Sequence, residues 1–312
     1  MIATGTGLAL SARPLRALAA DEQKWSYPIA FPGGLPGEEL FIKHGYACEH
    51  ATFYPGLFHT GENWYGIDRN AIEADVIASA DGEVVYADFD YPGRVVIVQH
   101  EESLYSVYGH LDYALSVDVG QRVNRGERLG SPLAFPDGIE RTHLHFEIRS
   151  FYISDLINGN HPSHGFTCGY QCPPGPGYWP IDAVNHPSEL GWMNPTHVIQ
   201  NRLFDSSPPL GAEAVATSDR ALQLWMKPSD HADAEPLGNL VASTGERFPL
   251  LAIATGEETS TLSSAFGYRL WYGIVSRELG EAWVEATQPS TDYVGNDGRP
   301  SAILFNFLPV LG

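Results

Sequence analysis

Hydrophobic residues from "HGYACEH" to "LHFEIRS" occur in short runs rather than at the 3.6-residue spacing of a helix. The runs "EVVYADF", "RVVIVQH", "SLYSVYGHL" and "LHFEIRS" are rich in β-branched and aromatic residues. Between them stand D-G, P-G and N-R-G sequences, which are typical of turns. The pattern predicts short strands joined by tight turns, and therefore a mainly β protein.

The last of these runs carries His143 and His145, which are separated by one residue. Side chains alternate between the two faces of a strand, so Leu144 and Phe146 are expected to face a core while both imidazoles share the opposite face. Two imidazoles on one face can serve one metal and one substrate. A solvated strand face would give the same pattern, but two further histidine segments, "GLFHTGENWYG" and "YSVYGHLD", argue against that alternative.

Five ordered segments give these histidines a context: "HTGEN", "VIASADGEVVYAD", "YGHL", "VDVGQRVNRGERLG" and "HLHFEIR". Together they resemble the lysostaphin-type (LytM-type) zinc metallopeptidases, which cut peptide bonds in bacterial cell-wall peptidoglycan. The family reads H-x-G-x-D, a Val-rich stretch with a D-G turn, Y-x-H-L, V-x-x-G-x-x-V-x-x-G and H-L-H-F-E. The resemblance covers His59 to Arg149, about a third of the chain.

The resemblance implies an antiparallel β-sandwich with a core like that of the lipoyl/biotinyl hybrid domains. Lipoyl- and biotin-carrier domains contain a phrase similar to "VDVGQRVNRGERLG", but they need a lysine at the tip of a tight hairpin. The lysines of this chain are Lys24, Lys43 and Lys227, and none lies in such a turn. A carrier role is therefore excluded.

The zinc ligands of the family map to His59, Asn63 and His145, and Asn63 stands where the family has an aspartate. A carboxamide offers only a neutral oxygen, so we expect looser metal binding and a more acidic bound water. The resemblance assigns catalysis to the two remaining histidines. His143 is the candidate general base, because an imidazole titrates near neutral pH, and His110 the candidate oxyanion donor, although the two roles could be exchanged.

Neighbouring carboxylates offer little to replace the missing ligand. Glu62 is expected to point away from Asn63 on an extended segment, and Asp68 lies in a predicted loop. Glu147 shares the face of His145 and is either its hydrogen-bond acceptor or a solvated residue at a strand end.

Two functions remain open. In the first, the chain is a zinc metalloendopeptidase that hydrolyses peptide bonds of peptidoglycan, and its cofactor is Zn2+. In the second, a degenerate and non-catalytic domain binds peptidoglycan or activates a partner cell-wall hydrolase. Retention of His110 and His143 favours the enzyme, because neither is needed merely to fold. No substrate-binding residue is predicted, and an extracytoplasmic location follows from the resemblance.

Gly-, Pro- and Ser-rich stretches between the strand-like segments predict that the chain has four parts. They are a Gly/Pro-rich lead-in at 1–42, a peptidase domain at 43–203 with an irregular insertion at about 150–192, a Pro/Ser/Gly linker at 204–217 and a small β-barrel with a tail at 218–312. The start of the lead-in is either the remnant of an export signal or a disordered tail. The last segment resembles bacterial Src-homology-three-like barrels, whose aromatic residues line a ligand groove or fill the core; for Trp283 the core is favoured.

Composition narrows the partners further. The chain has 312 residues and a net charge of −20, which would repel both nucleic acid and anionic lipid surfaces. No stretch approaches the roughly 18 to 20 apolar residues of a membrane span. Cys168 and Cys172 close a small loop that suits a disulfide, with a zinc half-site as the alternative, and Cys48 is then most simply a buried thiol.

Overall fold

The computed structural model describes a discontinuous set of residues. They are 25–47, 49–50, 54–67, 69–89, 93–135, 142–154, 156–157, 172–196, 198–199, 208, 210–216, 219–228, 233–255, 270–286, 288–294, 300–303 and 307–311. Only the backbone is described at 49–50, 89, 220, 255, 270 and from 288 onward. Cys48, Asp68 and Cys168 lie outside the described residues.

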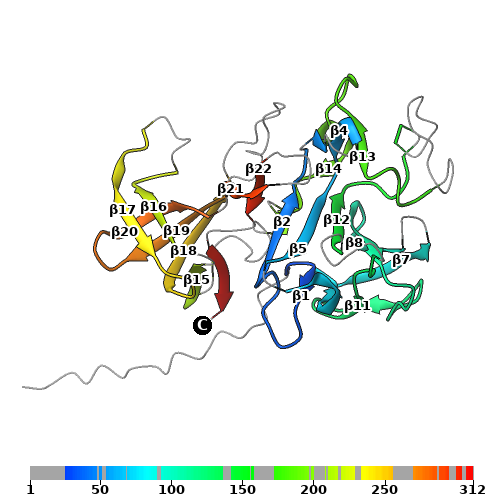
Figure 1. Ribbon diagram of the computed structural model, residues 1–312, viewed down its shortest axis with the longest axis horizontal. Helices are drawn as coiled ribbons and strands as arrows, with labels where there is room; N and C mark the ends of the chain where they lie inside the picture. The colour runs from blue at the N-terminus through cyan, green and yellow to red at the C-terminus, as the bar shows by residue number, and fades with distance from the viewer. Residues whose placement is uncertain are drawn as a thin grey trace, which may run out of the picture.

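An eight-stranded antiparallel sheet forms the first unit, in the order β10-β7-β8-β9-β12-β5-β2 with β14 beside β12 (Figure 1). Its strands are β2 (Leu40–His44), β5 (Glu62–Gly66), β7 (Gly82–Phe89), β8 (Arg94–Glu101), β9 (Leu104–Leu111), β10 (Arg122–Val123), β12 (Leu144–Arg149) and β14 (Trp192–Met193). The three runs predicted as strands before "LHFEIRS" form β7, β8 and β9, so the mainly β prediction is confirmed.

Among the described residues, this unit also contains two smaller sheets and two short 3-10 helices. One sheet contains β1 (Ile29–Ala30), β6 (Asp75–Ile77) and β11 (Arg128–Gly130). The other contains β3 (Glu49–His50), β4 (Tyr54–His59) and β13 (Tyr178–Pro180). The helices are η2 (Ala71–Glu73) and η4 (Pro187–Leu190).

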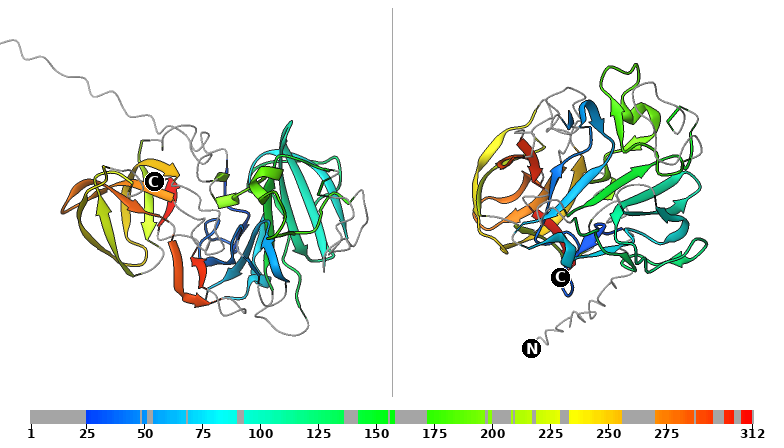
Figure 2. Two further views of the ribbon diagram at one scale, coloured as in Figure 1. Left: turned by 90° about the horizontal axis from the view of Figure 1, so that it is seen from above. Right: turned by 45° about the vertical axis from the view of Figure 1, so that its right-hand side comes forward.

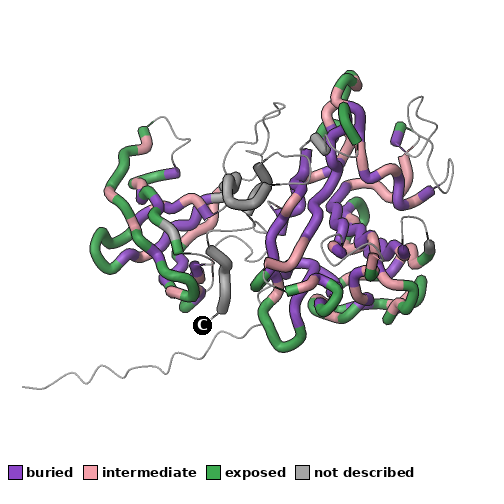
Figure 3. Tube along the Cα trace, viewed as in Figure 1, coloured by how far each residue is buried: buried purple, intermediate pink, exposed green. Residues whose placement is uncertain are grey.

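The core of this unit lies against one face of the large sheet. Figure 3 shows that β2, β5 and β12 are largely buried. Leu144, Phe146 and Ile148 of β12 are fully buried in the core, together with Tyr108 of β9. The expected alternation along β12 is therefore present. The opposite face of the same strand carries the residues of the candidate site.

A seven-stranded antiparallel sheet forms the second unit, in the order β17-β16-β20-β19-β18-β15-β23 (Figure 1). Figure 2 shows this unit, in yellow to red, from two further directions. Its strands are β15 (Ala212–Ala216), β16 (Arg220–Trp225), β17 (Pro236–Ala242), β18 (Arg247–Thr255), β19 (Leu270–Ser276), β20 (Gly280–Glu285) and β23 (Phe307–Leu311). A two-stranded ribbon of β21 (Gln288–Val294) and β22 (Pro300–Ile303) precedes β23, and β22 lies against β2. The likeness to Src-homology-three-like barrels stays a prediction.

Several expected segment limits differ from the observed elements. Residues expected in the lead-in form β1 and the start of β2, because the Gly/Pro sequence between them makes turns while its flanks pair with β6 and β5. The expected linker contains β15, which pairs with β18 and β23. Trp283 is only half-buried, opposite Trp225, whereas Ala282 and Val284 fill the core, so its expected core position is wrong.

No helix among the described residues has the length and apolar character needed to cross a bilayer.

Candidate metal centre

Three strands bring together the residues predicted as metal ligands. His59 ends β4, while Asn63 on β5 and His145 on β12 are directly opposite each other in the sheet. All three side chains are buried, with 0%, 3% and 2% of their surface exposed. Gly61 allows this approach, because a Cβ there would lie 2.3 Å from the carbonyl oxygen of Phe146.

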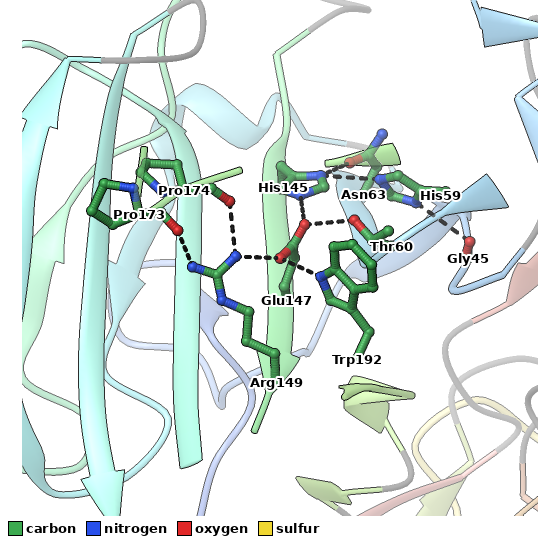
Figure 4. A network of polar contacts seen from close by, with 10 residues as sticks. All are labelled: Gly45, His59, Thr60, Asn63, His145, Glu147, Arg149, Pro173, Pro174 and Trp192. Atoms are coloured by element: carbon green, nitrogen blue, oxygen red, sulfur yellow. Dashed lines mark hydrogen bonds and ion pairs between the residues drawn. The ribbon is translucent and has the colours of Figure 1, made fainter. Parts of the chain in front are cut away.

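The polar atoms of these three residues converge on one point (Figure 4). Nε2 of His59 lies 3.0 Å from Nδ1 of His145, and the same Nδ1 lies 3.1 Å from Oδ1 of Asn63. Two zinc ligands that each lie about 2.0 to 2.2 Å from a shared ion are only slightly farther from each other than these separations of 3.0 and 3.1 Å. The separation is therefore short enough for a common cation.

The other ring nitrogens fix which tautomers are present. Nδ1 of His59 donates to the carbonyl oxygen of Gly45 at 3.3 Å, and Nε2 of His145 donates to Oε1 of Glu147 at 3.1 Å. Both partners can only accept, so in neutral rings the two facing nitrogens are unprotonated. Two lone pairs that face each other beside a carboxamide oxygen are stabilised by a proton or by a metal ion. The donor set therefore fits a cation such as Zn2+.

Glu147 lies at the centre of the surrounding hydrogen bonds and is fully buried. Burial by itself raises the pKa of this carboxyl, but the hydrogen bond from His145, the charge of Arg149 and the hydrogen bond from Thr60 together hold the pKa below its ordinary value. Glu147 is therefore a carboxylate. The prediction that it accepts from His145 is confirmed, and its alternative as a solvated residue is wrong.

Arg149 supports this carboxylate from the far end of β12. Its guanidinium lies 3.4 Å from Oε2 of Glu147 and donates to the carbonyl oxygens of Pro173 and Pro174, the latter at 2.8 Å (Figure 4). A third carbonyl, that of Tyr152, accepts at 3.2 Å. The segment after Cys172 is thereby attached to the site through a buried ion pair.

The two histidines predicted to be catalytic lie beside this cluster. The ring centroid of His110 is 4.7 Å from that of His143 and 6.0 Å from that of His145. His110 has a φ of 59°, a left-handed conformation that non-glycine residues seldom adopt, and it occupies an irregularity in the pairing of β8 and β9. Strained backbone of this kind concentrates at functional sites.

Aromatic side chains border both sides of the cluster. His143 stacks on Tyr65 at 4.7 Å and on Phe135 at 6.2 Å, which fixes the plane of its ring. On the other side Tyr178 lies opposite His59 in the β13–β4 pairing, with 5.2 Å between the ring centroids. Burial raises the pKa of Tyr178, so its phenol stays protonated. The exposed ring of Tyr54 covers Tyr178 at 4.2 Å.

The sequence matches Peptidase family M23 over residues 62–161. The chain carries an M23 peptidase domain. Residues 62–161 include Asn63, His110, His143 and His145 but not His59, which lies three residues upstream.

Curated relatives of the M23 domain come from bacteria. The chain is 35% identical over 97 residues to the cell division protein DipM of Caulobacter vibrioides, which covers 30% of this chain and 16% of that protein. It is 38% identical over 76 residues to the murein hydrolase activator NlpD of Escherichia coli, which covers 24% of this chain and 19% of that protein. The chain thus spans less than a third of the length of either relative.

Solved structures include the antimicrobial peptidase lysostaphin from Staphylococcus simulans. It aligns with 92% of this chain and 99% of its own, at 11% identity and a TM-score of 0.34.

The missing aspartate of the M23 site has no carboxylate substitute among the described residues. Glu62 points away from Asn63, as predicted, because its oxygens accept from Trp64 Nε1 at 2.9 Å and from Thr196 N and Oγ1 at 2.8 and 2.6 Å. Asp68 lies outside the described residues. In the part of the chain that the structure describes, no group of three or more His, Cys, Asp or Glu side chains is placed to hold a metal, so the Asn63 carboxamide stays the predicted third donor.

Of the three cysteines, only Cys172 lies among the described residues. Cys172 is buried and disulfide-bonded, which removes it from any zinc half-site. Its predicted partner Cys168, like Cys48, lies outside the described residues. Pro173 and Pro174, which follow Cys172 directly, supply the carbonyls that hold Arg149. Sequence analysis missed this connection, since no local signal links a proline pair to a strand more than twenty residues earlier.

Proposed function

We propose that this chain is a zinc-dependent endopeptidase that hydrolyses peptide bonds of bacterial peptidoglycan. The observation that carries the proposal is the convergence of two imidazole nitrogens, 3.0 Å apart, with the carboxamide oxygen of Asn63. The M23 match over 62–161 supports peptide bonds as the substrate. The names of DipM and NlpD, a cell division protein and a murein hydrolase activator, support the cell wall as its source.

His59, His145 and Asn63 would hold the ion, which when bound polarises the scissile carbonyl and lowers the pKa of water. The protein supplies the proton transfers. His143 takes the proton of the attacking water, because its ring is held by Tyr65 and Phe135 and remains half-exposed. His110, 4.7 Å from His143, donates a hydrogen bond to the oxyanion of the tetrahedral intermediate.

A neutral third ligand is the feature that separates this site from an ordinary M23 site. Asn63 leaves more positive charge on the ion and lowers its affinity, so less of the protein carries zinc at a given concentration. The alternative function follows from the same residue: a domain that has lost its metal binds peptidoglycan or activates a partner hydrolase, the role that the name of NlpD states for that relative. Both functions place the protein outside the cytoplasm.

Release of soluble fragments from purified peptidoglycan separates the two functions. We expect the protein with one equivalent of zinc to release peptide fragments, and a chelator to stop the release. His143→Ala should abolish release while zinc content stays unchanged, because His143 is not a ligand in the proposal. Release that persists in both His143→Ala and chelator would contradict the assignment.

Binding without cleavage is the signature of the alternative. His186→Ala is the control for His143→Ala in the release assay. It removes a histidine that caps η4 and leaves the proposed ligands in place, so it should release fragments like the wild type. If the wild type co-sediments with peptidoglycan but releases nothing at any zinc concentration, the activator function replaces the peptidase.

A further inference from the structure

The carboxylate of Glu147 accepts hydrogen bonds from four different side chains. Oε1 accepts from Thr60 Oγ1 at 2.7 Å and from His145 Nε2 at 3.1 Å. Oε2 accepts from Trp192 Nε1 at 3.1 Å and from Arg149 Nη1 at 3.4 Å. Because Glu147 is fully buried, water does not compete for any of these bonds.

The partners on the two oxygens differ in kind. An indole and a guanidinium can only donate, so the Oε2 position must hold an acceptor. A hydroxyl and an imidazole can each donate or accept, so the Oε1 position can hold either an acceptor or a donor. Arg149 cannot turn away, because the carbonyls of Pro173 and Pro174 hold the same guanidinium. The orientation of the carboxylate is therefore set from the Arg149 side and acts on His145.

We propose that Glu147 is a positioning residue that sets the tautomer of His145 and thereby prepares the metal site. With the proton held on Nε2 by Oε1, Nδ1 presents its lone pair to His59 Nε2 and Asn63 Oδ1. The inference deepens the proposed function, since it concerns the same site. Because the third ligand, Asn63, is neutral, metal binding at this site depends more heavily on the lone pair of His145 Nδ1.

Glu147→Gln tests this role because it is isosteric and its outcome can be derived. The Gln oxygen must take the Oε2 position, where Trp192 and Arg149 only donate, so the amide NH2 takes the Oε1 position. An NH2 group there requires His145 Nε2 to accept, which moves the ring proton to Nδ1. That proton then lies between His145 and His59 and blocks the metal.

Two measurements, one on metal-free and one on zinc-titrated protein, report the tautomer of His145 and the affinity for zinc without any cleavage assay. Nitrogen-15 NMR of labelled histidines reports which ring nitrogen of His145 carries the proton. Competition with a chromophoric chelator reports the zinc dissociation constant. We expect the Nε2–H form in the wild type and the Nδ1–H form in Glu147→Gln, with zinc binding about 10 to 100-fold weaker. Thr60→Val, which removes a donor to the same oxygen but keeps the carboxylate, should retain the Nε2–H form.

The role is overturned if Glu147→Gln keeps the Nε2–H form or binds zinc as tightly as the wild type. If the variant does not fold, the metal-free wild type still decides, because a neutral His145 that carries its only ring proton on Nδ1 contradicts the proposal. A wild type that shows the expected tautomer and zinc affinity but does not cleave peptidoglycan would remove the proposed activity and leave the role of Glu147 intact.

Discussion

Asn63→Asp converts the neutral third donor into a carboxylate with almost no change in shape. Oδ1 of Asn63 already lies 3.1 Å from the metal-facing nitrogen of His145, so the new charge would be in direct contact with the ion. A unit charge pair about 4 Å apart interacts by about 4 kcal/mol at an effective dielectric constant of about 20. Because residue 63 is only 3% exposed, the new carboxylate also loses its hydration, and this cost offsets part of the charge interaction.

The net gain in zinc binding is then about 1.4 to 2.8 kcal/mol, which is a tenfold to hundredfold lower dissociation constant. The same change should act in the opposite direction on the metal-free protein, because a buried carboxylate without its cation is destabilising. Thermal unfolding with chelator should therefore show a lower Tm than the wild type, and with saturating zinc a larger stabilisation.

Chelator competition and thermal unfolding on the same preparations measure both effects. Asn70→Asp is the matched control, since it adds the same charge at the cap of η2 and keeps the oxygen that accepts from Ile72 N. Zinc affinity that is equal in the wild type and in Asn63→Asp would show that position 63 is not a ligand, and the reasoning about the site would fail with it.

Three other changes test separate parts of the account. Gly61→Ala should lower the free energy of unfolding by about 1 to 3 kcal/mol and reduce zinc content, because its Cβ would lie 2.3 Å from Phe146 O; an unchanged urea midpoint would contradict this. His110→Ala should slow peptide release while leaving zinc content unchanged, as measured by metal analysis. The backbone N–H and the hydroxyl of Thr244 hold the pKa of Asp219 below its ordinary value, so this carboxylate stabilises the fold above its unfolded pKa, and that stabilisation is lost as pH falls through the lower folded pKa. Asp219→Ala should therefore lower the Tm at pH about 7 but not near pH about 2, and an equal loss at both would refute the assignment.

The sequence was informative where local rules decide the structure. Strand alternation placed His143 and His145 opposite the core, and the resemblance to the lysostaphin-type peptidases placed His59 and Asn63 beside them. Only the first of these steps follows from a rule that acts within one strand. The same alternation also predicted that Glu62 would point away from the site.

Contacts between distant segments could not be derived in this way. Glu147 had two open interpretations, because its burial depends on Trp192 and on the carbonyls that hold Arg149, all from the segment expected as an irregular insertion. Tyr178 reaches His59 through the pairing of β13 with β4, two strands that are more than one hundred residues apart. The Gly/Pro turns before residue 43 predict a lead-in, because the short segments that form β1 and begin β2 have no pattern of their own and pair only with distant strands.

Zinc content, measured after one equivalent of zinc is added to the metal-free protein and unbound metal is removed, decides whether the three residues form a metal site. We expect about one zinc per chain in the wild type and none in His145→Ala. A wild type that retains no zinc, or a His145→Ala variant that retains as much as the wild type, would contradict the claim that His59, Asn63 and His145 hold a metal.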